Sequence, residues 1–415
     1  MDNLPHLRRK GLSRRSPRRS VAKTGAVMPL VMLALVLLFV AGVGLLNLGM
    51  QSRLQAVYAG SEIAAKCAAD AGLEKAIFEM NQKLLIQPWD DSMLPESENE
   101  ALANCDATFS YDVDGDSATG FTVQSVGGCG RVVRSINCLL RLQGPFEFAV
   151  FGDQGVLLRN SAIVDWYNFD DEAESFSVGT NSTTPGAITL MNSAVVNGDV
   201  VIGPGGDPDV VVNSTWGNII GETYVASELY ELPQVTVPAE LLDMPSGGQI
   251  KDNTTITQSG KYDEIDLGNS EILIINGNVS LYIIGNIDLG NSAEVQVVGE
   301  DTNPNASLTL FLGGNFEGKN SSKVNNLTEN PRNLMIYGLD SCENMLFKNS
   351  GSFYGTIYAR NANVVMYNSA EVHGAVVANS VELKNSANLN YDASLRDADE
   401  DDQLVRFVIR RWQEE

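Results

Sequence analysis

The sequence predicts a mainly β protein: an N-terminal transmembrane α-helix, then a small α+β headgroup, then a right-handed parallel β-helix (solenoid). Three observations support this fold class. An uncharged apolar run from Thr24 to Ser52 passes without a break into an alanine-rich segment. Short segments between residues 99 and 144 alternate apolar and polar residues, as antiparallel strands do. Beyond Phe146, Asn-Ser pairs recur, and spacings such as 269 to 291, 349 to 368 and 368 to 385 fall near 17 to 22 residues, the period of a stacked solenoid.

Residues 1–25 form a basic leader, and residues 26–53 form the predicted transmembrane helix. The leader contains one acidic residue, Asp2, and eight basic residues: Arg8, Arg9, Lys10, Arg14, Arg15, Arg18, Arg19 and Lys23. About 20 apolar residues cross a bilayer as a helix, and positive charge ahead of the span stays in the cytoplasm. We therefore expect a single pass through the bacterial inner membrane, with the bulk of the chain periplasmic or extracellular. A secretory signal peptide is the alternative, but its apolar core is shorter, about 7–15 residues.

The apolar run continues as helix beyond the membrane. The segment from Ser61 to Ala76 has high helix propensity, and its apolar residues recur every three or four positions. We therefore expect one helix of about 55 residues that starts in the membrane and leaves it.

The N-terminus resembles a known family. Lys23-Thr-Gly25 is followed by Ala-Val-Met-Pro-Leu and later by Ala-Ala-Asp-Ala-Gly-Leu-Glu. This arrangement resembles pilin-like proteins of the type IV pilus and type II secretion systems, and it is most similar to PilX-like minor pilins, which serve in pilus assembly. The resemblance implies cleavage by a prepilin peptidase between Gly25 and Ala26, and contact of the helix with other pilins or filament subunits. Leu30 stands where major pilins carry a glutamate, which suits an accessory subunit. An uncleaved signal anchor is the alternative.

The net charge restricts the partners. The whole chain carries −24, and the leader through Thr24 contributes +7, so the exported part is near −31. Such an acidic chain is not suited to nucleic acid or to docking on anionic lipid.

Residues 54–144 are expected to form the headgroup. Strands are predicted at Thr108–Val113, Gly120–Ser125 and Arg131–Leu142, with a turn-rich loop at Asp114–Thr119 between the first two. In the pilin-like family a helix lies on such a meander.

Residues 145–395 are expected to form the β-helix. The Asn-Ser pairs begin at Asn160, Asn192, Asn213, Asn269, Asn291, Asn320, Asn349, Asn368 and Asn385. Asparagine tolerates left-handed backbone at corners and can stack in a hydrogen-bonded ladder. A leucine-rich repeat would need a regular leucine consensus, and a propeller would need blades of about 40 residues, and neither pattern is found here. A set of Asn-rich loops without a solenoid is the alternative. Residues 396–415 resemble the close of β-helical domains on PilX-like proteins, and we expect them to cap the solenoid or return along it.

No catalytic residue is assigned. The expected function is display of an adhesive or structural domain toward a glycan or surface ligand. The alternatives are a membrane-anchored polysaccharide lyase or hydrolase and a polymerising scaffold similar to bactofilins. An enzyme would need paired acids on one sheet, and the acids beside repeat positions are interpreted as solvated: Asp266, Glu271, Asp288 and Glu294. His6 lies in the leader, and His373 is interpreted as a turn or ladder residue.

A calcium site is the single cofactor considered. Asp112, Asp114 and Asp116 offer oxygen ligands at alternate positions. They lack the glycine and glutamate of an EF-hand, so a solvated hairpin turn is the preferred interpretation. No zinc spacing, phosphate-binding loop or nucleophile elbow is present.

The five cysteines suggest disulfides, since the chain is expected to be exported. A hairpin centred near Ser117 would place Tyr111 opposite Val123 and Cys105 opposite Cys129. That bridge would close a loop of roughly 25 residues and contribute about 3 kcal/mol. A second bridge is predicted between Cys67 on the helix and Cys138 on the third strand. Cys342 is expected to be a buried apolar residue.

Overall fold

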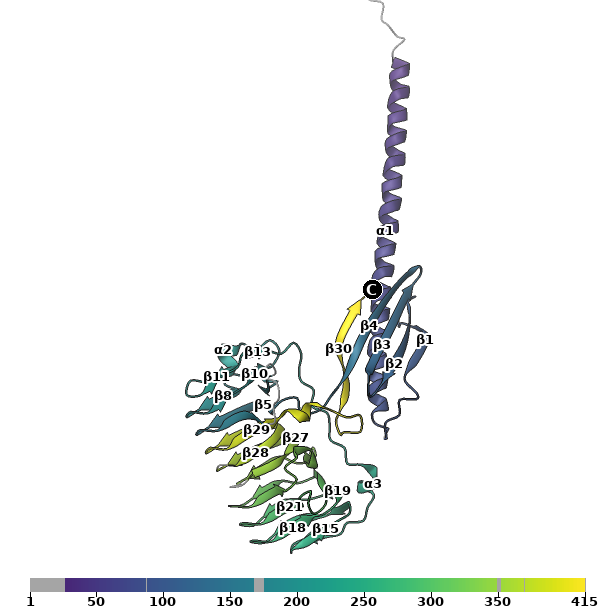
Figure 1. Cartoon of the computed structure of the whole chain (residues 1–415). Coiled ribbons are helices and arrows are strands. Elements are labelled where there is room, and N and C mark those ends of the chain that lie inside the picture. The colour runs from purple at the N-terminus through teal and green to yellow at the C-terminus, as the bar shows by residue number, and fades with distance from the viewer. Residues whose placement is uncertain (1–26, 87, 168–174, 349–351, 369, 415) are drawn as a thin grey trace, which may run out of the picture.

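The computed structural model describes residues 27–86, 88–167, 175–348, 352–368 and 370–414. A long helix leads into a five-stranded antiparallel sheet, here called the headgroup sheet. This sheet is joined to a stack of parallel strands, here called the strand stack (Figure 1). The predicted cleavage site, Gly25 and Ala26, lies outside the described residues.

Helix α1 runs from Val27 to Lys83, and its 57 residues match the single long helix that the sequence predicts. It is long and apolar enough to cross a membrane. Its first half is exposed, whereas one face of the second half is buried. The buried residues are Ala65, Ala68, Ala69, Gly72, Leu73, Ala76 and Met80. Because they recur every three or four positions, a single stripe of mostly small side chains faces the headgroup sheet.

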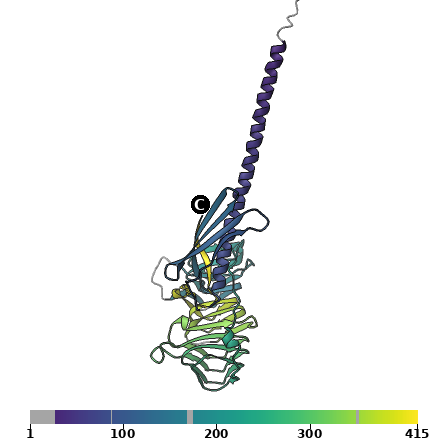
Figure 2. The same ribbon diagram turned by 90° about the vertical axis from the view of Figure 1, so that its right-hand side faces the viewer.

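The headgroup sheet packs on this stripe, as the two ribbon views show (Figures 1 and 2). Its strand order is β1-β2-β3-β4-β30. The bounds are Glu96–Ala101 for β1, Thr108–Asp116 for β2, Gly120–Cys129 for β3, Val132–Gln143 for β4 and Arg406–Glu414 for β30. Strands β2, β3 and β4 coincide with the three predicted strands, and the sequence had not indicated that β30 joins them.

The helix backbone approaches the backbone of β3 closely at Gly127. A Cβ atom there would lie 2.0 Å from the carbonyl oxygen of Ala65 and 2.4 Å from the amide nitrogen of Ala69. Since both atoms are helix backbone, no side chain movement could relieve the clash. Glycine at 127 and the small residues of the helix stripe therefore set the distance between α1 and the sheet.

The β2–β3 hairpin differs from the predicted register by two residues. Tyr111 lies opposite Ser125, and Val123 lies opposite Val113. Strand β2 extends to Asp116 and β3 begins at Gly120, so a three-residue turn replaces the predicted six-residue loop. This shift moves Cys105 away from the position opposite Cys129.

The strand stack contains the remaining strands, and the pairings between them are parallel. The first group is β5 (Val150–Arg159), β6 (Ile163–Tyr167), β7 (Ser177–Gly179), β8 (Ile188–Met191), β9 (Val195–Val196), β10 (Asp199–Ile202), β11 (Val212–Asn213), β12 (Asn218–Ile219) and β13 (Thr223–Val225). The second group is β14 (Gln249–Ile250), β15 (Thr254–Ile256), β16 (Gly260–Tyr262), β17 (Glu264–Leu267), β18 (Ile272–Ile275), β19 (Asn278–Ile283), β20 (Ile287–Leu289), β21 (Glu294–Val297), β22 (Ser307–Leu312), β23 (Phe316–Gly318), β24 (Lys323–Asn326), β25 (Leu334–Gly338), β26 (Asn344–Phe347), β27 (Ser352–Tyr367), β28 (Glu371–Lys384) and β29 (Asn388–Asp392). Helix is minor, as predicted: α2 (Pro208–Val211), α3 (Ala239–Leu242), η1 (Pro331–Asn333) and η2 (Ala393–Arg396).

The stack is not built in chain order. Strand β5 pairs on one side with β7 and β8 and on the other side with β28. Strand β6 likewise pairs with both β9 and β29. The first and last coils are therefore neighbours in the middle of the stack, and their contact is here called the seam. From the seam the chain builds outward to β13, crosses along the outside through residues 226–248, and restarts at β14 at the far end (Figure 1).

Asparagine ladders run along the stack, as the sequence predicted. The Nδ2 of Asn192 donates to Oδ1 of Asn160 at 2.8 Å, and that of Asn160 donates to Asn385 at 2.9 Å. Asn385 in turn donates to Asn368 at 3.1 Å. All four residues have φ between 52° and 59°, the left-handed region expected at corners. Because Asn160 and Asn385 belong to the first and last coils, this ladder crosses the seam.

Residues 396–415 do not form the predicted cap. Asp402 forms an ion pair with Arg332 at 3.4 Å, so the segment first rests on the stack. Strand β30 then leaves the stack and pairs antiparallel with β4. Phe407 on β30 is buried, with its ring 5.6 Å from that of Trp89 and 5.2 Å from that of Phe121. Burial of this aromatic residue beside the helix favours the sheet edge over a cap.

Candidate functional site

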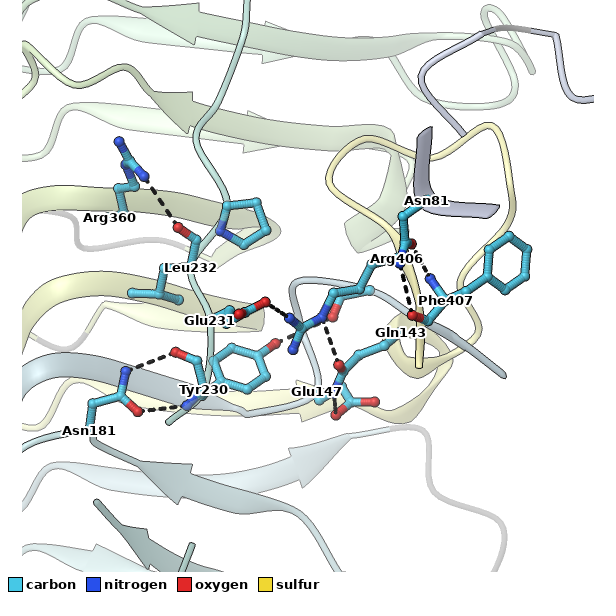
Figure 3. Close-up of polar contacts among 12 residues, drawn as sticks. Asn81, Gln143, Glu147, Asn181, Tyr230, Glu231, Leu232, Arg360, Arg406 and Phe407 are labelled. Atoms are coloured by element: carbon cyan, nitrogen blue, oxygen red, sulfur yellow. Dashed lines mark hydrogen bonds and ion pairs between the residues drawn. The ribbon is translucent and has the colours of Figure 1, made fainter. Parts of the chain in front are cut away.

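The headgroup and the stack meet at a polar junction, made by Gln143, Glu147, Tyr230, Glu231 and Arg406 (Figure 3). Arg406 donates through Nε to Oε1 of Gln143 at 3.0 Å and forms an ion pair with Glu231. Gln143 donates through Nε2 to Glu147. The junction therefore ties together the end of β4, the crossing segment and the start of β30.

The crossing segment is fastened to the outside of the stack on both sides of the seam. The backbone of Tyr230 and the side-chain amide of Asn181 exchange two hydrogen bonds of 2.8 Å (Figure 3). On the other side, Arg360 donates to the carbonyl of Leu232 at 3.3 Å, and the Tyr358 hydroxyl donates to that of Pro233 at 2.7 Å. The seam is thus covered by a strap, defined here as residues 226–238.

Burial of aromatic rings holds the strap in place. The Tyr230 ring lies 5.1 Å from that of Phe148 and 4.9 Å from that of Phe151. This burial raises the pKa of the Tyr230 hydroxyl far above its usual range, so the group stays neutral. The hydroxyl donates to the carbonyl of Gly144 at 3.4 Å, which links the strap to the connection after β4.

Strand β30 is anchored to the end of α1. The side-chain amide of Asn81 donates to the Phe407 carbonyl at 3.2 Å and accepts from its N–H at 2.7 Å (Figure 3). Sequence reasoning missed Asn81, Arg406 and the strap. A signal for the strap was available, because residues 226–248 contain three prolines and no asparagine repeat.

The three aspartates considered for calcium do not converge. Asp112, Asp114 and Asp116 are exposed on one face of β2. The Oδ1 of Asp116 accepts from the N–H groups of Ala118 and Thr119 at 3.0 and 2.7 Å, and hydrogen bonds from Thr119 lower the pKa of this carboxyl. Within the described ranges no group of three or more histidine, cysteine or acidic side chains is placed to hold a metal ion. The structure therefore gives Asp116 a role in the turn.

Neither predicted disulfide is formed, since all five cysteines are free thiols. Cys105 lies before β2, outside the residues that pair with β3, and donates to the carbonyl of Leu102. Cys67 is exposed because it falls outside the buried stripe of α1, whereas Cys138 is buried beneath the sheet. Burial raises the pKa of the Cys138 thiol to about 11. Cys342 is fully buried, as predicted.

The acids considered for catalysis follow two patterns. Asp266 and Asp288 lie next to each other in register on β17 and β20, and Glu317 on β23 continues the row. Burial, together with the charges of Glu317 and Asp266, raises the pKa of Asp288. Glu271 accepts from the N–H of Gly268, and Glu294 accepts from Asn325 at 2.8 Å. Neighbouring parallel strands place the row along one sheet at a spacing of about 4.8 Å.

His373 belongs to an aromatic stack. Its ring lies 4.3 Å from that of Tyr354, nearly parallel, and 4.7 Å from that of Tyr167. Burial lowers the pKa of His373, against the opposing effect of Glu371 at 3.4 Å from Nε2. The side chain is therefore a neutral stacked ring, which agrees with its interpretation as a ladder residue. His6 lies outside the described residues.

Comparisons with known proteins add the following. A family model described as a domain of unknown function (DUF7305) matches residues 217–398, which is less than half of the chain. No curated protein matches this chain. Among solved structures, the chain is similar to the competence-associated pilin ComZ from Thermus thermophilus, at 12% identity and a TM-score of 0.22, with 86% of this chain and 97% of that chain covered.

Proposed function

We propose that this chain is an accessory, PilX-like minor pilin of a type IV pilus or related secretion filament, which displays a right-handed parallel β-helix on its headgroup. The observation that carries the proposal is the insertion of the strand stack into the headgroup sheet. The chain enters the stack after β4 and leaves it before β30, and these two strands are adjacent in that sheet. The sheet in turn packs on the second half of α1.

The leader and the helix support the membrane part of the proposal. Basic residues precede an uncharged stretch that lies at the start of α1, so the N-terminus would stay in the cytoplasm and the stack would be outside. Leu30 in place of a glutamate removes a buried carboxylate that would need a partner from a neighbouring subunit. An accessory position in the filament fits this replacement.

The arrangement suits mechanical display. A force on the stack passes through two chain connections and the polar junction into the sheet and then into α1. Parallel strands with ladders of asparagine give a stiff outer surface, which would meet a glycan or another surface ligand. The proposal includes no reaction and no cofactor.

Cleavage at Gly25 tests the pilin assignment. In cells with an active prepilin peptidase, mass spectrometry of the membrane-extracted protein should show a mature N-terminus at Ala26. A Gly25→Arg variant should retain the leader, whereas the matched Gly11→Arg variant should be processed normally. Wild-type protein with an intact leader in such cells would identify a simple signal anchor and contradict the proposal.

A further inference from the structure

The two ends of the strand stack are not alike. At the β14 end, Ile250 and Ile256 are each only 5% exposed, and α3 packs beside β16 and β19. At the other end, β11, β12 and β13 form the last coil, and within the part of the chain that the structure describes each pairs only with the coil before it. Repeat stacks need a polar cap on their terminal coils. The coil of β11–β13 is here called the open end.

The open end exposes large apolar side chains beside a hollow. Trp216 is 71% exposed and Ile220 is 62% exposed, and Tyr224 and Val225 on β13 are 47% and 44% exposed. The same coil lines a hollow of about 870 Å³, together with α2 and Pro185. An unpaired edge with apolar side chains is a template for another strand.

The charge of this part of the chain selects the partner. Residues 160–250 contain thirteen aspartate and glutamate residues and no lysine, arginine or histidine. Glu222 lies in the open end itself, and Asp209 on α2 lines the hollow beside it. Two open ends would therefore repel each other, and the complementary surface must be extended, apolar and basic.

Strand β30 has these properties. It is the last strand of the headgroup sheet, with β4 on one side and no strand on the other among the described residues. Arg410 and Arg411 are exposed, and the adjacent Trp412 is 58% exposed. Strand β30 therefore offers the open end a free strand edge, an exposed apolar side chain and opposite charge.

Strand β30 and the open end also lie at similar positions along the axis of α1. In both ribbon views the open end lies beside the headgroup along the axis of α1, while the β14 end points away from the helix (Figures 1 and 2). Two copies anchored in one membrane by parallel helices would therefore present β30 and the open end at similar levels.

We infer that β30 of one copy docks on the open end of a second copy in the same membrane. The contact is heterologous, so each copy offers both surfaces and rows of copies form. The inference uses the membrane anchoring of α1 proposed above, but it does not depend on cleavage at Gly25. A chain that keeps its leader and still associates would leave this inference in place.

Charge reversal in the full-length protein in detergent tests the contact. Sedimentation should show wild-type association that weakens with added salt. The pair Arg410→Glu and Arg411→Glu, and separately the pair Asp209→Arg and Glu222→Arg, should each weaken association about tenfold or more. A mixture of the two variant proteins should regain it, because both contacts between unlike variants then join opposite charges, whereas contacts between like variants still join equal charges.

Sedimentation of a control variant and of the wild-type protein shows whether the inference fails. Asp243→Arg with Asp252→Arg, which changes charge near the β14 end of the stack, should leave association unchanged. Wild-type protein that stays monomeric, or variants that associate as well as wild type, would overturn the inference. If the Arg410 and Arg411 variant loses binding to vesicles of anionic lipid but keeps its association, β30 contacts the membrane and the proposed contact is wrong.

Discussion

At the scale of single residues, the close approach of the α1 backbone to β3 determines how the helix packs on the headgroup sheet. The atoms that a side chain at Gly127 would meet are the backbone oxygen of Ala65 and the backbone nitrogen of Ala69. A Cβ atom on the neighbouring Gly128 would point to the opposite face of β3 and would have free space there, with Thr108 Oγ1 at 3.9 Å as its nearest atom. Two adjacent glycines in one strand therefore have different roles.

Gly127→Ala should destabilise the headgroup, because the new methyl group must push α1 away from β3. We expect a loss of about 1–3 kcal/mol, typical of overpacking. Urea denaturation of the full-length protein measures it. Gly128→Ala is the matched control and should change the midpoint little. Equal effects of the two substitutions would show that helix approach does not set the requirement for glycine.

His373 should make the stack less stable in mild acid. Its pKa is lowered in the folded protein by burial, while Glu371, Glu329 and Asp392 nearby raise it in part. Above the ordinary pKa of about 6.5 neither state is protonated, so His373 has no effect there. As the pH falls below that value, the unfolded chain binds the proton more readily than the folded protein does. The free energy of unfolding therefore falls until the pH reaches the pKa of His373 in the folded protein. The total loss is about 1.4 kcal/mol for each unit by which the folded and unfolded pKa values differ.

A His373→Phe variant keeps the ring against Tyr354 and cannot titrate. Urea midpoints measured at about pH 7 and pH 5 should therefore differ less in the variant than in the wild-type protein. Asp288 acts in the opposite sense, because its raised pKa returns stability as the pH falls, and it is unchanged in the variant. An identical pH dependence in the two proteins would exclude His373 as the group responsible.

At the scale of elements, the asparagine corners combine two requirements. Asn160 must adopt a φ of 56° and must also join Asn192 to Asn385 through its side chain. Alternation of apolar residues fills the interior of each coil, whereas the corners hold the coils in register. The ladder therefore stabilises the contact between coils.

The two requirements at Asn160 can be separated. Asn160→Gly loses the ladder but accepts the left-handed backbone, and we expect a cost of about 0.5–1.5 kcal/mol. Asn160→Ala loses the ladder and adds strain of about 1–2 kcal/mol. Denaturant midpoints of the two variants give the difference directly. If alanine were tolerated as well as glycine, the left-handed backbone would not matter at this corner.

At the scale of the whole molecule, the stack is closed on itself by the seam. Eight residue pairs join β28 to β5, and five join β29 to β6. The strap crosses this region on the outside and is bound to both halves. The two halves of the stack are therefore held together by strand pairing as well as by the covalent chain.

Cutting the strap tests this arrangement. A protease site inserted between Ser227 and Glu228 should allow cleavage, and the two fragments should still elute together on gel filtration, because the seam and the pairing of β4 with β30 both join them. They should separate on a denaturing gel. Because β30 also joins the fragments by pairing with β4, the seam is tested in a chain that ends at Leu404. In that chain Val376→Asp buries a charge at the seam and should let the cleaved fragments separate under native conditions. Separation of the fragments without that substitution would show that the strap alone holds the halves.

The sequence by itself determined the elements with local causes. The charge pattern and helix propensity of the first part of the chain predict α1 nearly to its length. Alternation predicts β2, β3 and β4, and the Asn-Ser pairs predict left-handed corners and ladders. Each of these depends on residues that are close in sequence, or on a repeat that applies the same rule to every coil.

The tertiary structure decided the features that join distant segments. The seam joins residues 150–167 to 376–392, and β30 returns to β4 rather than capping the stack. A repeat looks the same in whichever order its coils are stacked, so the sequence does not indicate that order. The hairpin register, and with it the position of Cys105, follows from packing of the sheet on α1. Burial and strand pairing across hundreds of residues select these arrangements, and no local pattern in the chain records them.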